Sequence, residues 1–171
     1  MANYISNYIE SPNLDLSNSN IILQTSPSKL FKEGLSLLTE ISTASIYVKS
    51  SKPENLNKEI VYAHFDTGAS QTSIDINLAK HLKLPQIGLI EMNTAGGRRI
   101  FPKYIIDISF INTGLNPFIN LEISSCDLSL DLKRNNISPT FDNFGLLIGR
   151  DIMSHWHITW NGPSSTAIIS D

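Results

Sequence analysis

The sequence predicts an all-β fold with one or two short helices, and three observations lead to this prediction. Short runs rich in β-branched and aromatic residues recur along the chain, and clusters of Ser, Asn, Pro and Gly separate them. Signals for helices are brief. Two β-like arms are joined by adjacent glycines, which is typical of a hairpin with positive φ angles at its tip.

Residues 1–39 are interpreted as an N-terminal extension, and residues 40–171 as the folded domain. The extension is rich in Asn and Ser, with only short apolar pairs, so we expect it to be partly ordered at best. Ser26-Pro27 can begin a short helix that carries Phe31, Leu35 and Leu38 on one face, although Gly34 disfavours it.

The first half of the domain contains two β-rich runs, a short helix and the hairpin. The strands are expected at 41–49 and 59–65, with the turn cluster 50–55 between them. Asp75 can cap a helix whose apolar positions are Leu78, Ala79 and Leu82, and Pro85 ends it. The hairpin arms are expected at 90–93 and 100–111.

The second half continues with a strand at 118–124 and then a long loop. Residues 126–143 mix charges with Asn, Ser and Pro139, which favours irregular structure. The chain then closes with an apolar strand at 146–148, a short helix from about Arg150, a strand at 156–160, a turn at 161–163 and a last strand at 166–169.

Length and composition exclude several function classes. A chain of 171 residues fits one domain whose core needs no disulfide or metal. The formal net charge of −3 gives no basic surface for nucleic acid, and no apolar stretch approaches the roughly 18 residues of a membrane span. The N-terminal residues lack a signal-peptide pattern. Together with the single cysteine, Cys126, this leads us to expect a cytoplasmic protein.

Two motifs carry the chemistry. The first follows the apolar run 60–65 and consists of Asp66, Thr67, Gly68 and Ala69. The second lies much later in the chain and consists of Leu147, Ile148, Gly149 and Arg150. An Asp-Thr-Gly triplet alone is a weak signal, because three residues recur by chance. Its place at the end of a predicted strand, together with the second motif, makes the pair a much stronger one.

The order of these elements and motifs resembles a subunit of a retropepsin-like aspartic protease, over roughly residues 40–170. The resemblance implies an acid-protease barrel in which Asp66 is the catalytic residue. It implies that Thr67 forms a hydrogen bond across a dimer, and that Gly68 and Ala69 lie against the substrate backbone.

The same resemblance gives roles to the hairpin and to the second motif. The hairpin tip corresponds to the flap that closes over a bound peptide, and its residues are Thr94, Ala95, Gly96 and Gly97. Leu147, Ile148 and Gly149 correspond to the segment that supports the active-site loop. Arg150 corresponds to the arginine that begins the C-terminal helix.

Two features depart from the family pattern. Viral members often carry an Asp at the position of Ser70, where it pairs with the arginine of the helix. The partner of Arg150 is therefore open, and Asp75 is one candidate. The N-terminal extension is the second departure, because terminal strands join the two subunits in this family and an extension can alter that interface.

Two carboxyl groups that share one proton can activate water and supply a proton during peptide hydrolysis. This chain has one Asp-Thr-Gly motif, so the mechanism requires a symmetric homodimer in which Asp66 meets its counterpart. The sequence therefore predicts an aspartic endopeptidase that acts on peptide or protein substrates without metal or cofactor.

Other functions remain open at this point. A dimeric retropepsin fold that cleaves slowly or not at all could serve as a peptide-binding or assembly module. An aspartyl-phosphate enzyme is disfavoured, because the chain has no phosphate-binding glycine loop. His155 and His157 lack a third ligand at metal spacing, and Arg98 and Arg99 are interpreted as a solvated turn or as contacts for acidic substrates. Asp151 is assigned to the helix N-terminus, with a second catalytic carboxylate as the alternative.

Overall fold

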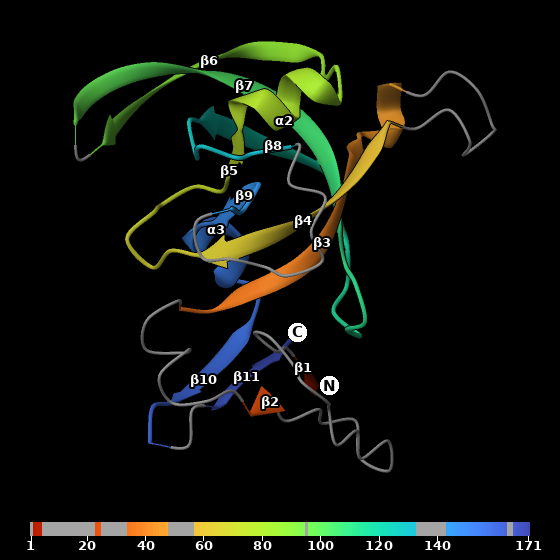
Figure 1. Cartoon of the computed structure of the whole chain (residues 1–171), viewed down its shortest axis with the longest axis vertical. Helices are drawn as coiled ribbons and strands as arrows, with labels where there is room; N and C mark the ends of the chain where they lie inside the picture. Colours follow the sequence, from red (N-terminus) through yellow and green to blue (C-terminus); the bar gives the residue numbers. More distant parts are fainter. Residues whose placement is uncertain are drawn as a thin grey trace.

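A computed structural model describes residues 2–4, 23–24, 34–47, 57–94, 96–132, 143–163 and 166–171. These residues form a mostly β structure with two short α-helices (Figure 1). The strands are β1 (Ala2–Tyr4), β2 (Leu23–Gln24), β3 (Ser36–Thr43), β4 (Lys58–Phe65), β5 (Ser73–Asp75), β6 (Gln86–Thr94), β7 (Gly97–Phe110), β8 (Phe118–Cys126), β9 (Leu146–Ile148), β10 (His157–Asn161) and β11 (Thr166–Ser170). The helices are α2 (Ile76–His81) and α3 (Arg150–Met153).

The larger sheet closes into a barrel. Its strand order is β3-β4-β9-β5-β8-β7-β6, and β3 also pairs with β7. Six strands therefore form a closed ring, and β6 extends from it as the outer arm of the β6–β7 hairpin. Closure satisfies the backbone hydrogen bonds of strand edges that would otherwise be free. The prediction of an all-β fold is confirmed.

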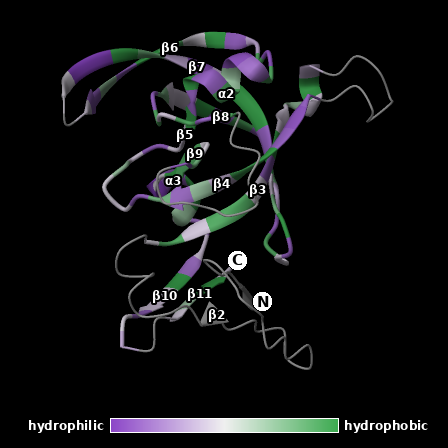
Figure 2. Ribbon diagram, in the orientation of Figure 1, coloured by the Kyte–Doolittle hydropathy of each residue, from purple (hydrophilic) through white to green (hydrophobic). Residues whose placement is uncertain are grey.

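The buried core is mostly aliphatic and contains residues of the barrel strands and of β11. Figure 2 shows hydrophobic residues along the barrel strands. The largest fully buried side chains of the core are Leu37, Ile41, Ile74, Leu78, Leu82, Ile106, Ile108, Ile123, Leu146, Ile148 and Ile152. Alternation along the strands produces this burial, because successive side chains point to opposite faces. On β4, Val61, Ala63 and Phe65 contribute to the core, so Tyr62 and His64 lie on the opposite face.

A smaller sheet contains both ends of the chain. Its central strand is β11, which pairs with β10 along one edge and with both β1 and β2 along the other. The pairing with β1 spans residues 168–170 of β11, and the pairing with β2 spans residues 166–167. Parts of the predicted extension are therefore strands of this sheet.

The structure also corrects the start of the domain. The boundary expected between residues 39 and 40 falls inside β3, so the barrel begins before it. The helix expected to carry Leu35 and Leu38 is wrong, because Leu38 lies in β3 and Leu35 is buried beside it; Phe31 is outside the described residues. Burial of Leu35 and Leu37 in the core outweighs the helical spacing.

The remaining elements agree closely with the expected order. The strand before the Asp66 motif, the hairpin, the helix capped by Asp75 and the final strands are all present, with ends that differ by a few residues. The strand expected at 41–49 is wrong beyond Thr43, because β3 spans Ser36–Thr43 and Ser45–Tyr47 form a short 3-10 helix. Part of the loop expected at 126–143 lies outside the described residues. Within the described ranges, no helix is long and apolar enough to cross a membrane.

Candidate active site

Asp66 lies at the start of the loop between β4 and β5. Its N–H donates to the carbonyl of Ile148 at 3.0 Å, which continues the parallel pairing of β4 with β9. The N–H of Gly68 donates to the Asp66 carboxylate at 2.8 Å, and the N–H of Ala69 donates to the Asp66 carbonyl at 3.1 Å. These bonds hold the carboxylate over a tight turn whose residues Thr67 and Gly68 are exposed.

The far end of this loop packs on Gly149. A methyl group at position 149 would lie 2.4 Å from the carbonyl carbon of Gln71 and 2.8 Å from the Thr72 nitrogen. Both neighbours are backbone atoms, so the contact requires glycine. Gly149 has φ −90°, which any residue can adopt, so the requirement is for space. The predicted support by the second motif thus has a physical basis at this residue.

A buried hydrogen-bond network joins the same loop to α3. The Thr72 hydroxyl donates to Asp151 Oδ1 at 2.8 Å and accepts the Gly149 N–H at 3.1 Å. The Thr72 N–H also donates to the Asp151 carboxylate. The Asp151 carboxylate accepts the N–H of Ile152 as well, in the first turn of α3. The Asp151 carboxylate therefore joins the loop to α3 and does not serve as a second catalytic carboxylate.

Arg150 holds the exposed part of the turn. One guanidinium nitrogen donates to the carbonyls of Thr67 at 2.6 Å and Gly68 at 3.1 Å, and its backbone N–H donates to the carbonyl of Ala69. The carbonyls of Thr67 and Gly68 therefore accept hydrogen bonds from Arg150, in place of the carboxylate that Ser70 does not provide. Three contacts from one residue fix the orientation of the turn relative to α3.

Asp75, the candidate partner of Arg150, is not its partner. Its side chain is fully buried and accepts the N–H groups of Asn77 and Leu78, as predicted for the cap of α2. Its second carboxylate oxygen accepts the N–H of Leu128 at 2.9 Å. Capping and loop anchoring use both oxygens, which leaves Asp75 a structural residue.

The β6–β7 hairpin has the tip that the sequence predicts. Gly97 has φ +96°, and the Thr94 hydroxyl donates to the Gly97 carbonyl and accepts the Gly96 N–H. Ala95 lies outside the described residues. In the view of Figure 1 the hairpin projects on the same side of the barrel as the Asp66 loop.

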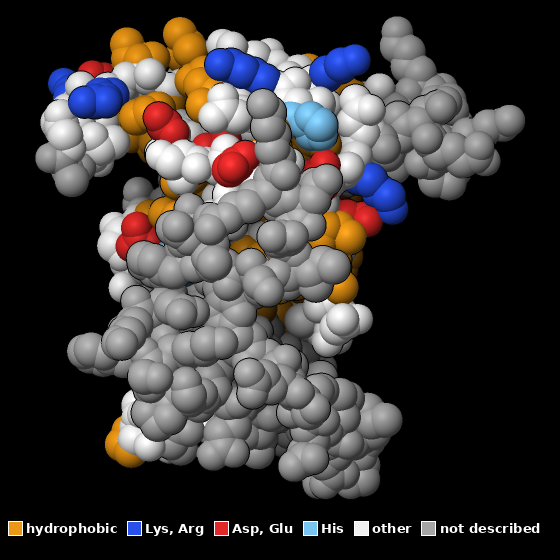
Figure 3. Space-filling model, in the orientation of Figure 1, with side chains coloured by type: hydrophobic (Ala, Val, Ile, Leu, Met, Phe, Trp, Pro, Cys, Tyr) orange, Lys and Arg blue, Asp and Glu red, His pale blue; other side chains and the backbone are white. Residues whose placement is uncertain are grey.

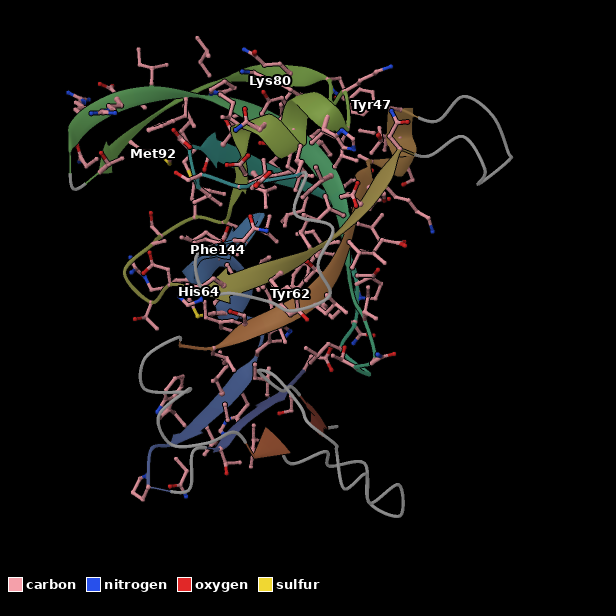
Figure 4. The ribbon with its side chains drawn as sticks, viewed as in Figure 1. Tyr47, Tyr62, His64, Lys80, Met92 and Phe144 are labelled. Atoms are coloured by element: carbon pink, nitrogen blue, oxygen red, sulfur yellow. The ribbon has the colours of Figure 1, made fainter. Side chains whose placement is uncertain are left out.

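The two faces of the hairpin differ. Ile90, Met92 and Phe101 share one face by strand register and are half-buried; Figure 4 labels Met92 near the tip. On the other face Leu89 and Ile100 are 63% and 65% exposed. Figure 3 shows hydrophobic side chains beside charged ones over the hairpin, where Arg98 forms an ion pair with Glu91.

His64 belongs to the electrostatic surroundings of Asp66, and the sequence analysis did not single it out. Burial lowers the pKa of His64, and the negative charge of Asp66 opposes that effect. Leu147 pairs with His64 in the β4–β9 register and is half-buried, whereas its neighbour Ile148 is buried in the core. The alternation of side chains along β4 could have indicated His64.

Other candidate residues lie elsewhere or have structural roles. Burial raises the pKa of Cys126 to about 11, which keeps this thiol protonated and unreactive. The ring of His155 packs against Phe118, and His157 lies 3.4 Å from the Thr159 hydroxyl. Within the part of the chain that the structure describes, no group of three or more His, Cys, Asp or Glu side chains could hold a metal ion.

Comparison with protein-family models gave no match, and comparison with the curated proteins gave none either. The functional interpretation therefore depends on the motifs and on the geometry described above.

Proposed function

We propose that this protein is an aspartic endopeptidase that works as a homodimer. The observation that carries the proposal is the way the Asp66 turn is held. Its backbone bonds to Ile148, its far end packs against Gly149, and Arg150 clamps its carbonyls, which leaves the carboxylate half-exposed at the surface. A scaffold this specific around an accessible carboxylate fits a catalytic group better than a turn cap.

The second carboxyl group comes from a second copy of the chain. Among the described residues, the Asp66 carboxylate receives one hydrogen bond, from the Gly68 N–H. A two-fold axis beside the exposed turn brings two Asp66 side chains together and creates one site from two chains. Two such carboxyls cannot both ionise readily at close range, so the pair shares a proton.

The proposed reaction follows from this shared proton. The ionised carboxylate takes a proton from a water molecule whose oxygen attacks the peptide carbonyl, and the protonated carboxyl donates its proton to the carbonyl oxygen. Collapse of the tetrahedral intermediate breaks the C–N bond, and the leaving nitrogen takes a proton from the pair. No metal or organic cofactor takes part.

The substrate is an extended peptide or protein segment. Ile90, Met92 and Phe101 give the hairpin a half-buried apolar face, which is suited to cover a peptide, and the backbone of an extended peptide adds β-type hydrogen bonds. The proposal includes neither nucleic acid nor membrane as a partner. It places the enzyme in the cytoplasm, where reducing conditions keep Cys126 as a free thiol.

A cleavage assay tests this function. Wild type, Asp66→Asn and the control Asp127→Asn are incubated with a panel of denatured proteins, with and without a pepstatin-type inhibitor. Asp127 is exposed, and its carboxylate accepts the N–H of Ser129 in a local turn. We expect wild type and Asp127→Asn to cleave and Asp66→Asn to be inactive. Cleavage by Asp66→Asn at the wild-type rate would exclude the proposal, and binding of peptides without cleavage by wild type would favour the assembly module.

A further inference from the structure

The two adjacent arginines of the β6–β7 hairpin lie on opposite faces, because successive side chains of a strand alternate. Arg99 pairs with Met92 across the hairpin, and directly paired residues share a face. Arg99 therefore lies on the half-buried apolar face, together with Ile90, Met92 and Phe101. Arg98 lies on the exposed outer face. Residue type does not distinguish the two arginines, whereas their place in the sheet does.

β7 carries three cationic side chains, and two of them have a carboxylate partner. Arg98 forms an ion pair with Glu91, and Lys103 Nζ lies 2.6 Å from Glu122 Oε2. Among the residues that the structure describes, Arg99 has no carboxylate within ion-pair distance. Arg99 is also exposed. Its charge is therefore available to a ligand that carries a carboxylate.

The guanidinium of Arg99 lies at the hairpin tip without closing it. A methyl group at Gly96 would lie 3.2 Å from Arg99 Nη2, which places the guanidinium beside the turn. The turn itself is closed by Thr94, whose hydroxyl donates to the Gly97 carbonyl and accepts the Gly96 N–H. Substitution of Arg99 therefore leaves the bonds that shape the tip in place. A role in shaping the turn does not explain why a cation stands on this apolar face.

A carboxylate of the substrate is the group that this arrangement suits. The proposed function places an extended peptide against the half-buried face, and Figure 1 shows the hairpin projecting on the same side of the barrel as the Asp66 loop. The planar guanidinium of Arg binds a carboxylate through two parallel N–H···O bonds. A bound peptide and the apolar neighbours of Arg99 exclude water, which strengthens such a pair. Among peptide side chains, only Asp and Glu supply a carboxylate.

We propose that Arg99 is a specificity-determining residue that binds an Asp or Glu side chain of the bound peptide. The substrate class is then an extended segment that carries an acidic residue within a few positions of the cleaved bond. Arg98 takes no part, because it lies on the other face and has its own carboxylate partner. The selection of cleavage sites rests on the proposed function, whereas the preference for acidic peptides can be measured as binding alone.

Binding is measured first, with Asp66→Asn as the parent so that a bound peptide is not cleaved. The immobilised protein is incubated with a library of random decapeptides, amidated at the C-terminus so that only side chains supply carboxylates, and bound peptides are sequenced by mass spectrometry. We expect Asp and Glu to be enriched, the enrichment to disappear when Arg99→Gln is added, and Lys and Arg to be enriched when Arg99→Glu is added. The control Arg98→Gln changes the net charge equally and should keep the acidic preference. Equal loss in Arg98→Gln and Arg99→Gln, or no acidic enrichment in the parent, overturns the proposal.

Cleavage of matched peptides then tests the consequence for the reaction. A sequence cut by wild type in the denatured protein panel is synthesised with Glu and with Gln at its acidic position. We expect kcat/KM to favour the Glu peptide by about five-fold in wild type and Arg98→Gln, and by roughly one-fold in Arg99→Gln. The wild-type preference should decrease at 1 M NaCl, where exposed charges are screened. A preference that Arg99→Gln leaves unchanged contradicts the proposal. Acidic binding without cleavage of any peptide would support the role of Arg99 and refute only the proposed function.

Discussion

Gly149→Ala should loosen the loop that carries Asp66. The added methyl group would lie 2.4 Å from the carbonyl carbon of Gln71. Carbon atoms normally pack at about 3.5–4.0 Å, so the loop and α3 have to separate by roughly 1 Å. Overpacking of this kind costs about 1–3 kcal/mol, and weakening of the buried Thr72–Gly149 hydrogen bond adds about 1 kcal/mol. The expected loss is therefore about 2–4 kcal/mol, or a fall in Tm of roughly 5–15 °C.

Urea and thermal unfolding followed by circular dichroism measure this loss, and Gly88→Ala is the matched control. A methyl group at position 88 meets nothing within 4 Å, and Gly88 has no positive φ. Its substitution should be neutral, or stabilising by less than about 1 kcal/mol. If Gly149→Ala were as stable as Gly88→Ala, the loop would not pack on Gly149 as described and the reasoning would be refuted.

Three further predictions concern groups that are buried or half-buried. Thr72→Val should lower the unfolding free energy by about 2 kcal/mol, because Asp151 and the Gly149 N–H both lose a hydrogen-bond partner. The control Thr39→Val loses one neutral bond to the Val61 carbonyl and should cost about 1 kcal/mol in the same urea titration, and equal losses would contradict the network. Burial raises the pKa of Cys126 to about 11. At pH 8 the thiol reagent DTNB should therefore react roughly 100-fold more slowly with the native than with the denatured protein, and equal rates would show an accessible thiol. Because burial lowers the pKa of His64, the unfolded chain takes up a proton near pH 6.5 that the folded chain binds only at lower pH. The unfolding free energy should therefore fall as the pH drops below about 6.5, and it should fall more in wild type than in His64→Asn; an identical pH dependence of the two proteins would exclude the effect.

Features that depend on local sequence could be predicted well. The cap at Asp75 follows from a residue type and the apolar positions behind it, and the structure has the expected hydrogen bonds to Asn77 and Leu78. The tip at Gly97 follows from the need for a positive φ between two β-like arms. In both cases the determining interactions lie within a few residues along the chain.

Features that depend on distant contacts could not be predicted. The pairing of β3 with β7 closes the barrel, and the pairing of β3 with β4 begins at Ser36, so the segment near Leu35 that was expected to be helical leads into a strand. The partners of Arg150 are main-chain carbonyls, and residue types give no signal for these. The bond between Thr72 and Asp151 joins residues that are far apart in the sequence, so only the fold reveals it.

Mixing of wild-type and Asp66→Asn subunits tests most directly whether the active site is shared between two copies. The two proteins are combined at a fixed wild-type concentration, denatured and refolded together so that subunits exchange, and assayed for peptide cleavage. With a nine-fold excess of Asp66→Asn, random pairing leaves about one tenth of the wild-type chains in wild-type dimers. The account predicts that activity per wild-type chain falls to about one tenth. With Asp127→Asn in the same excess, every dimer is expected to be active, so activity per total chain should stay constant. Activity per wild-type chain that stays constant in the presence of Asp66→Asn would contradict a shared site.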